Sequence, residues 1–494
     1  MESLWLASAP SISADAFVPG GSYDTVVAGA GLTGLTTALL LARRGQKVAV
    51  LEARQAGAVT SGNTTAKLSL LQGLQLSRIA SHQGPDGVRD YVEANRAGQD
   101  WLLEFCREHD VDHDIRTAYT YALGDGGRRS LDKELSAATA AGLAVRMTRD
   151  TELPFAVSGA LELAGQAQIH PLQALASLAA EFRAQGGTLV QGVRVTGAGT
   201  ASGNRVRVIT SSGSVSAQHL VLATGIPVLD RGGYFARLLP LRSYAMAHPV
   251  TGDVPQGMYL SIDSPSRSLR TARVEGTDYL ISGGNGHAVG RHPHPQALVD
   301  DLAGWTRNHF AVSSPAYSWS AQDYEPAAGL PYVGQVPFGD GSIFAATGFN
   351  KWGMTNAVAA ALVLAEAMAP AAEDSRTGNW YSPKLSSRDV LSAARDNAEV
   401  GLEMVAGWAS SMAGTDQAAP PEGQGKVVRR KAKPVGVCTV NGEVSRVSAV
   451  CPHLAGVLSW NDAEASWDCP LHGSRFAADG KLLEGPAVRG LDPA

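Results

Sequence analysis

Residues 25–34 read Thr25-Val-Val-Ala28-Gly29-Ala-Gly31-Leu-Thr-Gly34, and the helical run Leu35 to Arg44 follows them. The first four residues form a short apolar strand, and the three glycines have the G-x-G-x-x-G spacing of a dinucleotide-binding turn. The first glycine permits a sharp bend, the second lets the backbone approach a pyrophosphate, and the third lets the helix pack on the strand. The stretch therefore predicts the first strand, turn and helix of a Rossmann-type α/β domain.

A second strand supports this interpretation. Residues 47–51 are apolar after Lys47 and end at Glu52, which lies eighteen residues beyond Gly34. An acidic residue at this place can accept hydrogen bonds from a ribose. NAD and FAD share the pattern, so these residues alone leave the nucleotide open.

Two pairs of metal-ligating residues lie near the other end of the chain. Cys451 and His453 form a C-x-H pair, Cys469 and His472 form a C-x-x-H pair, and fifteen residues (454–468) separate them. A Rieske 2Fe-2S cluster takes two thiolates on one iron and two imidazoles on the other. Zinc also binds two Cys and two His, but zinc sites usually place the two Cys in one short motif and the two His in another. The mixed Cys-His pairs here therefore favour the cluster.

The two loops resemble Rieske ligand loops, with C-P-H-L-A-G at 451–456 and C-P-L-H-G-S-R-F at 469–476. Gly485-Pro486-Ala487 resembles the proline loop that covers the cluster in that family. The respiratory-chain version joins its loops by a disulfide, and here those positions hold Gly456 and Leu471. Phe476 stands where a hydrogen-bonding Tyr often sits, so we expect a reduction potential in the lower part of the Rieske range.

Most of the remaining chain resembles the D-amino-acid oxidase type of FAD oxidoreductases, in the subgroup with a C-terminal Rieske domain. Thr60-Ser-Gly-Asn-Thr-Thr-Ala-Lys-Leu-Ser69 is similar to the second flavin loop of that family. Further similar segments are Gln168 to Pro171, Val221 to Gly225, Tyr279 to His287, Trp319 to Gly334, and Ala346-Thr-Gly-Phe-Asn-Lys-Trp-Gly-Met-Thr355. The resemblance implies FAD as the nucleotide.

The resemblance also implies which residues bind FAD. They come from the first turn, the second strand, the second flavin loop, later strands and the last motif: Gly29, Ala30, Gly31, Leu32, Thr33, Gly34, Glu52, Ala53, Thr64, Thr65, Lys67, Leu68, Val195, Thr224, Gly225, Gly348, Lys351, Gly353, Met354 and Thr355. The last motif opens a helix, whose first amides and positive dipole end suit an anionic reduced flavin.

Three candidate catalytic residues follow from position. Lys351 would add positive charge beside the flavin, although a loop lysine is more often solvated. Trp352 would wall the substrate pocket. His287 lies in a segment that is close to the flavin in related folds, and a packed histidine is the alternative. His170 precedes Pro171 at a strand-to-helix junction, where a capping role is natural.

One departure concerns the substrate. Relatives that oxidise amino acids such as sarcosine carry a lysine for the substrate carboxylate where Thr355 stands here. We expect Arg242, in Pro240-Leu-Arg-Ser-Tyr244, to replace that charge and Tyr244 to offer a hydroxyl. A neutral amine as substrate is the alternative.

These anchors predict the domain organisation. Residues 1–370 form an α/β FAD-binding Rossmann-type domain with a mixed-sheet substrate domain. The FAD-binding pieces lie at about 22–80, 160–230 and 330–370, and the substrate domain lies between them. A helical connector and linker follow at 371–425, and a small all-β Rieske domain occupies 426–494. Apolar spacing predicts helices at 85–109 and 132–141, and short alternating runs predict a sheet at 236–290.

Composition excludes several classes. Lys and Arg number 41 and Asp and Glu 46, so the net charge of −5 implies no strong electrostatic partner. The basic run Lys426 to Lys433 lacks interleaved aromatics, which disfavours nucleic acid and leaves a solvated strand or a docking face for an electron carrier. No secretory signal or membrane span is evident, and Cys106 and Cys438 suggest no disulfide, so we expect a cytoplasmic protein.

Together these patterns predict an FAD-dependent oxidoreductase. Gly284-Asn-Gly286-His-Ala-Val-Gly290 is not followed by a helix, so no second nucleotide site is evident and an organic substrate should reduce the flavin. We expect an amine or amino-acid-like substrate to give up a hydride to FAD, and a Rieske cluster to pass the electrons singly to an external protein. A relay between protein partners without a small substrate, or an oxidase whose cluster is structural, are the alternatives.

Overall fold

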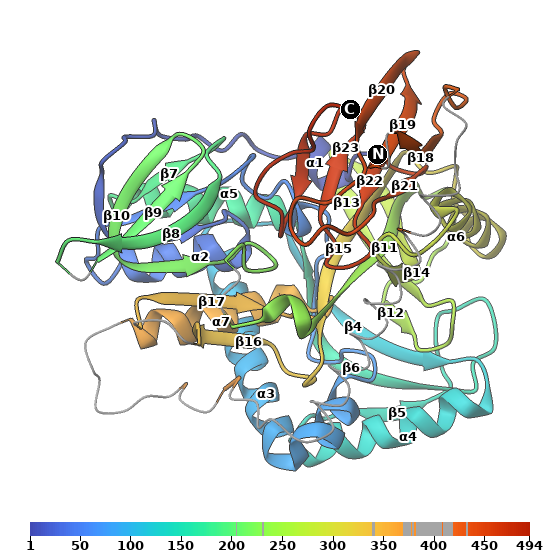
Figure 1. Cartoon of the computed structure of the whole chain (residues 1–494). Coiled ribbons are helices and arrows are strands. Elements are labelled where there is room, and N and C mark those ends of the chain that lie inside the picture. The colour runs from blue at the N-terminus through green and yellow to red at the C-terminus, as the bar shows by residue number, and fades with distance from the viewer. Residues whose placement is uncertain are drawn as a thin grey trace.

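The structure is a computed structural model of the chain and is shown in Figure 1. It describes residues 1–203, 205–229, 232–337, 341–368, 377, 380–381, 408, 418–430 and 433–494. The predicted connector and linker at 371–425 fall largely outside these residues. Two large sheets and a C-terminal all-β unit make up the described part, which confirms the predicted fold class.

The first sheet forms the nucleotide-binding layer, at the left of Figure 1. Its strands run in the order β16 (Tyr332–Gln335), β17 (Ile343–Thr347), β10 (Gly213–Leu222), β1 (Ser22–Ala28), β2 (Val48–Leu51) and β7 (Thr188–Val190), and β9 (Arg205–Thr210) and β8 (Val195–Ala201) extend it from β10. β1 pairs in parallel with β2 and with β10. Parallel strands of this kind need both faces covered.

Alternate residues of β1 meet different cores because side chains alternate along a strand. Val27 packs in the core formed with helices α2 (Leu32–Ala42), α5 (Pro171–Ala184) and α7 (Gly353–Ala367). Val26 packs in the core on the side of β8 and β9. α5 begins after His170, whose ring nitrogen accepts a hydrogen bond from the Gln173 N–H at 3.2 Å, so the predicted capping role of His170 is confirmed.

The second sheet is called here the roofing sheet. It is mixed because β12 runs parallel to β4, while the other strand pairs of the sheet are antiparallel. Its strands run in the order β15 (Tyr317–Pro326), β11 (Leu238–Pro249), β14 (Thr277–Ala288), β13 (Arg267–Val274), β12 (Met258–Ser261), β4 (His113–Ala122), β6 (Gly159–Ile169) and β3 (Lys67–Leu68), with β5 (Arg146–Thr148) on β6. α6 (Pro295–His309) packs on β14 and β11.

Two helices in the substrate-side region start earlier than their apolar spacing predicts. α3 spans Gln75–Glu108 and α4 spans Asp125–Ala140. α3 contains Pro85, and Gly84 before it has a φ of 73°, so the helix is kinked there. The Gly-Pro pair is a helix breaker in sequence, and the turns before it are held by packing, since Leu76 and Ile79 are buried in a core with α4 residues.

The N-terminal residues are ordered against the second flavin loop. After the short helix α1 (Leu4–Ala7), the chain runs to β1, and the loop itself contains η1 (Thr60–Gly62). The Ser3 hydroxyl donates to the Gly62 carbonyl at 2.6 Å, and the Trp5 indole N–H donates to the Thr64 carbonyl at 2.7 Å. The N-terminal arm therefore holds this loop from outside.

The C-terminal unit consists of two antiparallel sheets. One is formed by β18 (Gly425–Arg430), β19 (Lys433–Val440) and β20 (Glu443–Ser448), and the other by β21 (Ser459–Asn461), β22 (Ser466–Asp468), β23 (Arg475–Ala477) and β24 (Leu482–Glu484). Trp467, Phe476 and Leu458 fill its core. In Figure 1 these red strands lie beside β11, β14 and β15 of the roofing sheet.

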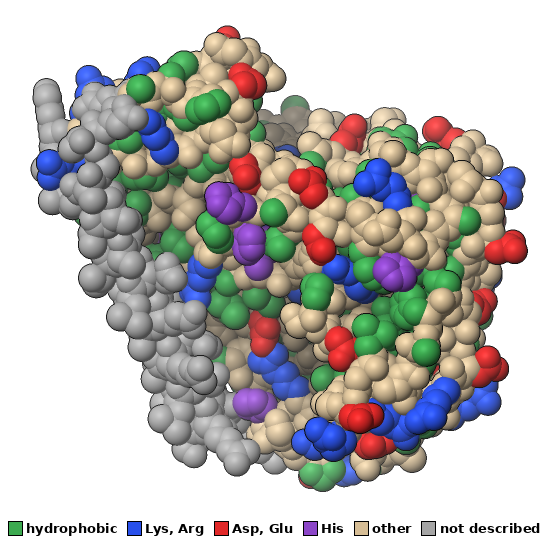
Figure 2. Space-filling view, turned by 90° about the vertical axis from the view of Figure 1, so that its right-hand side faces the viewer, with side chains coloured by type: hydrophobic (Ala, Val, Ile, Leu, Met, Phe, Trp, Pro, Cys, Tyr) green, Lys and Arg blue, Asp and Glu red, His purple; other side chains and the backbone are tan. Residues whose placement is uncertain are grey.

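Charged side chains of both signs are interspersed over the face of the molecule shown in Figure 2, as the small net charge leads one to expect. The predicted basic run is split between β18 and β19, with Arg429, Arg430 and Lys433 exposed. Among the helices of the described ranges, none has the length and apolarity to span a membrane.

Candidate functional site

A cavity of about 580 Å³ lies between the nucleotide-binding layer and the roofing sheet. The glycine turn after β1 forms one end of it. Gly29 has a φ of 104°, and a side chain there would collide with the Ala223 carbonyl of the neighbouring strand end. A side chain at Gly34 would collide with the Gly29 carbonyl. The turn therefore requires glycine at both positions, as a pyrophosphate-binding turn does.

Glu52 stands at the end of β2 beside this turn. Its carboxylate accepts hydrogen bonds from the Ala30 N–H at 2.9 Å and from the Arg54 N–H at 2.8 Å. It lines the cavity together with Ala53. The carboxylate is thereby fixed at the wall of the cavity, where a ribose would need it.

The second flavin loop lines the cavity and ends in β3, the edge strand of the roofing sheet that pairs with β6. The Ser61 hydroxyl accepts the Leu32 N–H at 3.0 Å, which ties the loop to the first turn of α2. Lys67 is buried, and its ammonium donates to the Tyr259 carbonyl at 2.6 Å and the Ser268 hydroxyl at 2.7 Å. Burial, with a smaller contribution from Arg270, lowers the pKa of the Lys67 ammonium to about 7.

Most of the predicted FAD-binding residues line this one cavity although they are far apart in sequence. Those that line it are Gly29, Gly31, Leu32, Thr33, Glu52, Ala53, Thr64, Thr65, Lys67, Val195, Thr224, Gly225, Lys351, Gly353 and Met354. Those outside its wall are Ala30, Gly34, Leu68, Gly348 and Thr355. The Thr355 hydroxyl is instead hydrogen-bonded to Asn95 inside the protein.

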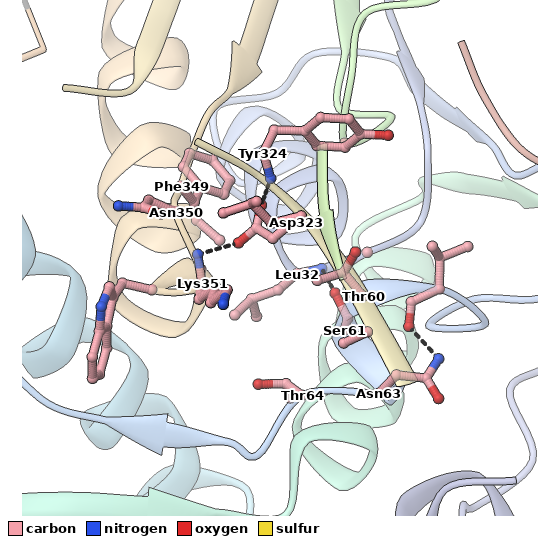
Figure 3. Close-up of a pocket in the computed structure, with 18 of the residues that line it drawn as sticks. Leu32, Thr60, Ser61, Asn63, Thr64, Asp323, Tyr324, Phe349, Asn350 and Lys351 are labelled. Carbon is pink, nitrogen blue, oxygen red and sulfur yellow. Dashed lines mark hydrogen bonds between the residues drawn. The ribbon is translucent and has the colours of Figure 1, made fainter. Parts of the chain in front are cut away.

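The start of α7 forms the opposite wall. No side chain caps this helix end at Trp352, and Gly353 and Met354 line the cavity, so the first amides and the positive end of the helix face it. Trp352 and Lys351 also line it. Asp323, which the sequence interpretation did not single out, accepts the Lys351 backbone N–H at 2.6 Å at the same place (Figure 3).

Of the other three catalytic candidates, Tyr244 lines the cavity and Arg242 and His287 do not. Side chains alternate along β11, and Ser243 and Ala245 line the cavity. Arg242 is 2% exposed and forms an ion pair with Glu464 of the C-terminal unit. It does not line the cavity, so the prediction that it binds a substrate carboxylate is wrong in this structure.

Tyr244 and His287 follow the same alternation. Tyr244 reaches the edge of the cavity wall, but its ring packs with Met246 and Leu302 and stacks on His287 at a centroid distance of 5.7 Å. His287 is absent from the wall, and its Nδ1 lies 3.2 Å from the Asn285 carbonyl. Burial lowers the pKa of the His287 imidazole. His287 therefore lies outside the wall that a substrate would contact, whereas a substrate contact from Tyr244 stays a prediction.

The four predicted cluster ligands lie together at the tips of two loops. Cys451 and Cys469 are buried in one core, and the rings of His453 and His472 are 5.2 Å apart. A hydrogen bond from Cys469, and then the amides of His453 and Leu454, lower the pKa of the Cys451 thiol. Amides directed at sulfur suit a thiolate that ligates iron.

The histidine side of this group also fits metal ligation. The Nδ1 atom of His472 is buried and has no hydrogen-bond partner among the described residues. Burial lowers the pKa of the His472 imidazole to about 4, so the ring is neutral and one of its nitrogens has a lone pair for a metal ion. No three His, Cys, Asp or Glu side chains converge on one metal ion in the described ranges, and a Rieske iron takes only two protein ligands.

The positions that carry a disulfide in the respiratory version are in contact here. A side chain added at Gly456 would lie 2.7 Å from the Leu471 side chain and 3.2 Å from the Cys469 sulfur. All four cysteines of the chain are free. Leu471 thus fills with apolar atoms the space that the bridge would occupy.

The C-terminal unit is joined to the roofing sheet by a buried charge network. Arg242 contacts Glu464 and lies 3.5 Å from Glu484, and Arg475 contacts Glu464 at 3.1 Å, Glu484 at 2.7 Å and Asp468 at 3.0 Å. Burial alone would raise the pKa of the Glu464 carboxyl, but the two guanidinium groups outweigh it and hold this pKa well below its usual range.

The same unit reaches the cavity and presents its histidines to the rest of the chain. Leu483, Glu484 and Gly485 line the cavity wall. The ring of Phe235, in η2 (Tyr234–Ala236), stands edge-on to the ring of His472 at 5.2 Å. The two predicted cofactor sites are therefore neighbours within one chain.

Comparisons with known proteins agree with this architecture. The model of the family FAD dependent oxidoreductase, DAO, matches residues 24–367, and the model of the Rieske [2Fe-2S] domain matches residues 411–493. YhfW of Bacillus subtilis (strain 168), which carries the name of a Rieske 2Fe-2S iron-sulfur protein, is 30% identical over 99% of this chain and 97% of its own length. The cytochrome b6-f complex iron-sulfur subunit of a Synechococcus strain is 44% identical over 64 residues, which are 13% of this chain and 37% of that protein.

Solved structures share the fold at low identity. A glycine oxidase from Geobacillus kaustophilus has a TM-score of 0.59 at 19% identity and covers 70% of this chain and 95% of its own. An L-amino acid deaminase from Proteus myxofaciens has a TM-score of 0.58 at 16% identity and covers 73% and 93%. The cofactors are FAD and a 2Fe-2S cluster, and the chain belongs to the DAO family of FAD-dependent oxidoreductases and carries a C-terminal Rieske domain.

Proposed function

We propose that the protein oxidises an amine or amino-acid-like substrate at FAD and passes the electrons singly through its Rieske cluster to an external protein acceptor. The observation that carries the proposal is the shared wall: residues of the Rieske strand β24 line the same cavity as the dinucleotide-binding turn. When bound, FAD supplies two-electron hydride chemistry and the cluster supplies one-electron transfer.

Different residues of the cavity would contact different parts of FAD and of the substrate. The glycine turn and Glu52 would hold the nucleotide half of FAD, and the α7 N-terminus with Lys351 would face the flavin half. The roofing sheet closes the other side with a row of small or apolar residues, Ala245, Gly283, Ser268 and Leu260, on neighbouring strands. Such a row leaves space for a small substrate and excludes bulk water.

Lysines in the cavity wall would supply positive charge to an anionic group of the substrate, beside the arginines Arg54, Arg78 and Arg194 and the carboxylates of Glu52, Asp323, Glu325 and Glu484. Arg242 is occupied in the interdomain network, and Lys67 and Lys351 are the lysines that line the described wall. Lys67 is held by two neutral acceptors under the roofing sheet. The solved structures that share this fold include a glycine oxidase and an L-amino acid deaminase, which by name act on amino acids.

Contacts between the two sites support an internal electron route. The Ala487 N–H in the proline loop donates to the Ser474 hydroxyl at 3.0 Å, and Leu483 to Gly485 just before it line the cavity. The Gln322 amide of β15 donates to the Gly473 carbonyl, next to His472, at 2.8 Å. These contacts bring the Rieske ligand loop and the cavity wall into direct connection.

An anaerobic titration tests the proposal. A panel of amines and amino acids is added to the holoprotein while flavin absorbance and the paramagnetic signal of the reduced cluster are followed together. We expect one member to bleach the flavin and to produce the cluster signal. Bleaching by NADH alone, or by a reduced ferredoxin alone, would refute a substrate-driven direction.

A Cys451→Ser variant separates the role of the cluster from that of the flavin. We expect it to lose the cluster signal and still be bleached by the substrate, but to reduce a one-electron acceptor protein more slowly. Unchanged turnover with one hydrogen peroxide formed per substrate would show that the cluster is structural.

A further inference from the structure

The turn between β17 and α7 has an uncommon backbone. Asn350 and Lys351 are consecutive non-glycine residues with φ angles of 49° and 68°. Left-handed conformations cost non-glycine residues free energy and persist only where surrounding contacts impose them. Both residues line the cavity, so the strain lies beside the FAD site.

Asp323 on β15 supplies the main contact that imposes this turn. Its carboxylate accepts the Lys351 N–H at 2.6 Å through one oxygen and its neighbour Tyr324's N–H at 2.7 Å through the other. Figure 3 shows the carboxylate between these two backbone groups. The Asn350 N–H also donates to the Tyr324 carbonyl at 3.1 Å. The turn is thus tied to β15 at two successive residues.

The side chain of Lys351 ends under the roofing sheet. A Cβ added at Gly286 on β14 would lie 2.5 Å from the Lys351 Nζ and 3.1 Å from the Ser243 hydroxyl. The absence of a side chain at Gly286 therefore leaves room for the ammonium. The ammonium of Lys351 is placed from two sides, by the clamp on its backbone and by the gap at Gly286.

The Asp323 carboxylate and the Lys351 ammonium also influence each other electrostatically. Burial raises the pKa of Asp323 to about 6, and the two backbone N–H groups oppose this rise. Surrounding protein atoms desolvate the Lys351 ammonium and lower its pKa, which Asp323 and Glu325 partly offset, although the residue is exposed to the open cavity. Glu325 itself is paired with Arg78. Asp323 is therefore the cavity carboxylate that faces Lys351 without an ion pair to another side chain in the described residues.

We propose that Asp323 is a positioning residue for the flavin: it clamps the left-handed turn so that the Lys351 ammonium is held in the cavity and raises the reduction potential of bound FAD. The inference depends on FAD in this cavity and is independent of the substrate and of the electron route. A positive charge beside the flavin favours the anionic reduced form, so losing the clamp makes reduction less favourable.

The experiment measures the midpoint potential of FAD in full-length holoprotein by equilibration with dithionite and reference dyes. We expect Asp323→Ala to shift the two-electron equilibrium at least tenfold toward oxidised FAD, which is about 30 mV. Asp323→Asn, which keeps one acceptor oxygen, should give a smaller shift. In a Lys351→Met background, Asp323→Ala should no longer lower the potential, because the charge it positions is gone.

Gly286→Ala displaces the ammonium without touching the clamp. Gly286 is not among the positive-φ residues, so alanine fits its backbone, and the added methyl carbon meets Nζ. We expect a shift of the same sign as in Asp323→Ala and no shift in the Lys351→Met background. FAD content and far-ultraviolet circular dichroism verify that each variant is folded and loaded.

Three results would overturn the proposal. An unchanged or higher potential in Asp323→Ala would show that the loss of its negative charge equals or outweighs any effect through Lys351. An equal effect of Asp323→Ala with and without Lys351 would show that it does not act through the ammonium. A crystal structure of Asp323→Ala that keeps φ near 50–70° at Asn350 and Lys351 would show that the clamp is not needed.

Discussion

Replacing Arg242 by methionine tests whether the C-terminal unit is held by the buried charge network. Methionine matches the length of the arginine stem but leaves Glu464 and Glu484 with Arg475 as their remaining guanidinium partner. Arg242 is 2% exposed and makes both a paired contact to Glu464 and a longer one to Glu484. Removing one partner of a buried ion pair costs about 3–5 kcal/mol, because an uncompensated charge stays buried.

The assay is urea unfolding of the holoprotein, followed separately by flavin fluorescence and by cluster absorbance. Arg489→Met is the matched control, because Arg489 pairs with Asp492 on the surface of the same unit at 60% and 73% side-chain exposure. A surface change of this kind alters stability by at most about 0.5 kcal/mol. A double-mutant cycle with Glu464→Gln then isolates the coupling between the two charges.

A loss of less than about 1 kcal/mol in Arg242→Met, or a coupling energy near zero, would refute the reasoning from burial. The same variant separates the network role from the discarded substrate role. A raised KM with unchanged stability would restore Arg242 as a substrate-binding residue.

The remaining predictions concern pH, the nucleotide turn, the N-terminal arm and the cluster. The pKa of the Glu464 carboxyl is lower in the folded chain than its ordinary value of 4.5. The stabilising effect of the ionised carboxylate is therefore full above pH 4.5 and is lost as the pH falls below 4.5. We expect the urea midpoint to fall more steeply below pH 4.5 in the native protein than in Glu464→Gln. Gly34→Ala should abolish FAD retention, measured as the flavin-to-protein absorbance ratio, whereas Gly199→Ala, where an added carbon meets nothing within 4 Å, should retain it. Trp5→Ala should cost about 3–5 kcal/mol in the same unfolding assay, since the buried indole supports the second flavin loop. Cys469→Ser should remove the paramagnetic signal of the cluster and leave the yellow chromophore.

Features set by local spacing were predictable from the sequence. The glycine turn at 29–34 depends on backbone contacts within a few residues and the adjoining strand, and the spacing of Cys451, His453, Cys469 and His472 reflects the chemistry of a single cluster. The fold class followed from these patterns and from the family resemblance, and the family match to 24–367 bears it out.

The direction of side chains on the roofing sheet was not predictable in the same way. Both faces of β11 are buried, one against the cavity and one against α6 and the Rieske domain. Hydrophobic alternation assigns a face only when the other face is polar, so nothing local separates Arg242 from Ser243 and Ala245. Asp323 was missed for a related reason, because its partner Lys351 lies 28 residues away.

The fixed contacts between the two units bear on how electrons would leave the flavin. A Rieske domain that had to move between two positions would need a weak, exposed interface, whereas here Arg242, Glu464 and Arg475 are all largely buried between strands of both units. Glu484 belongs both to this network and to the cavity wall, so displacing the Rieske domain would open the wall and expose unpaired charges at the same time. Both changes would accompany the same displacement, so we expect electron transfer across the docked interface rather than by domain motion. The outgoing electron would then have to leave by another side of the cluster than the one covered by Phe235.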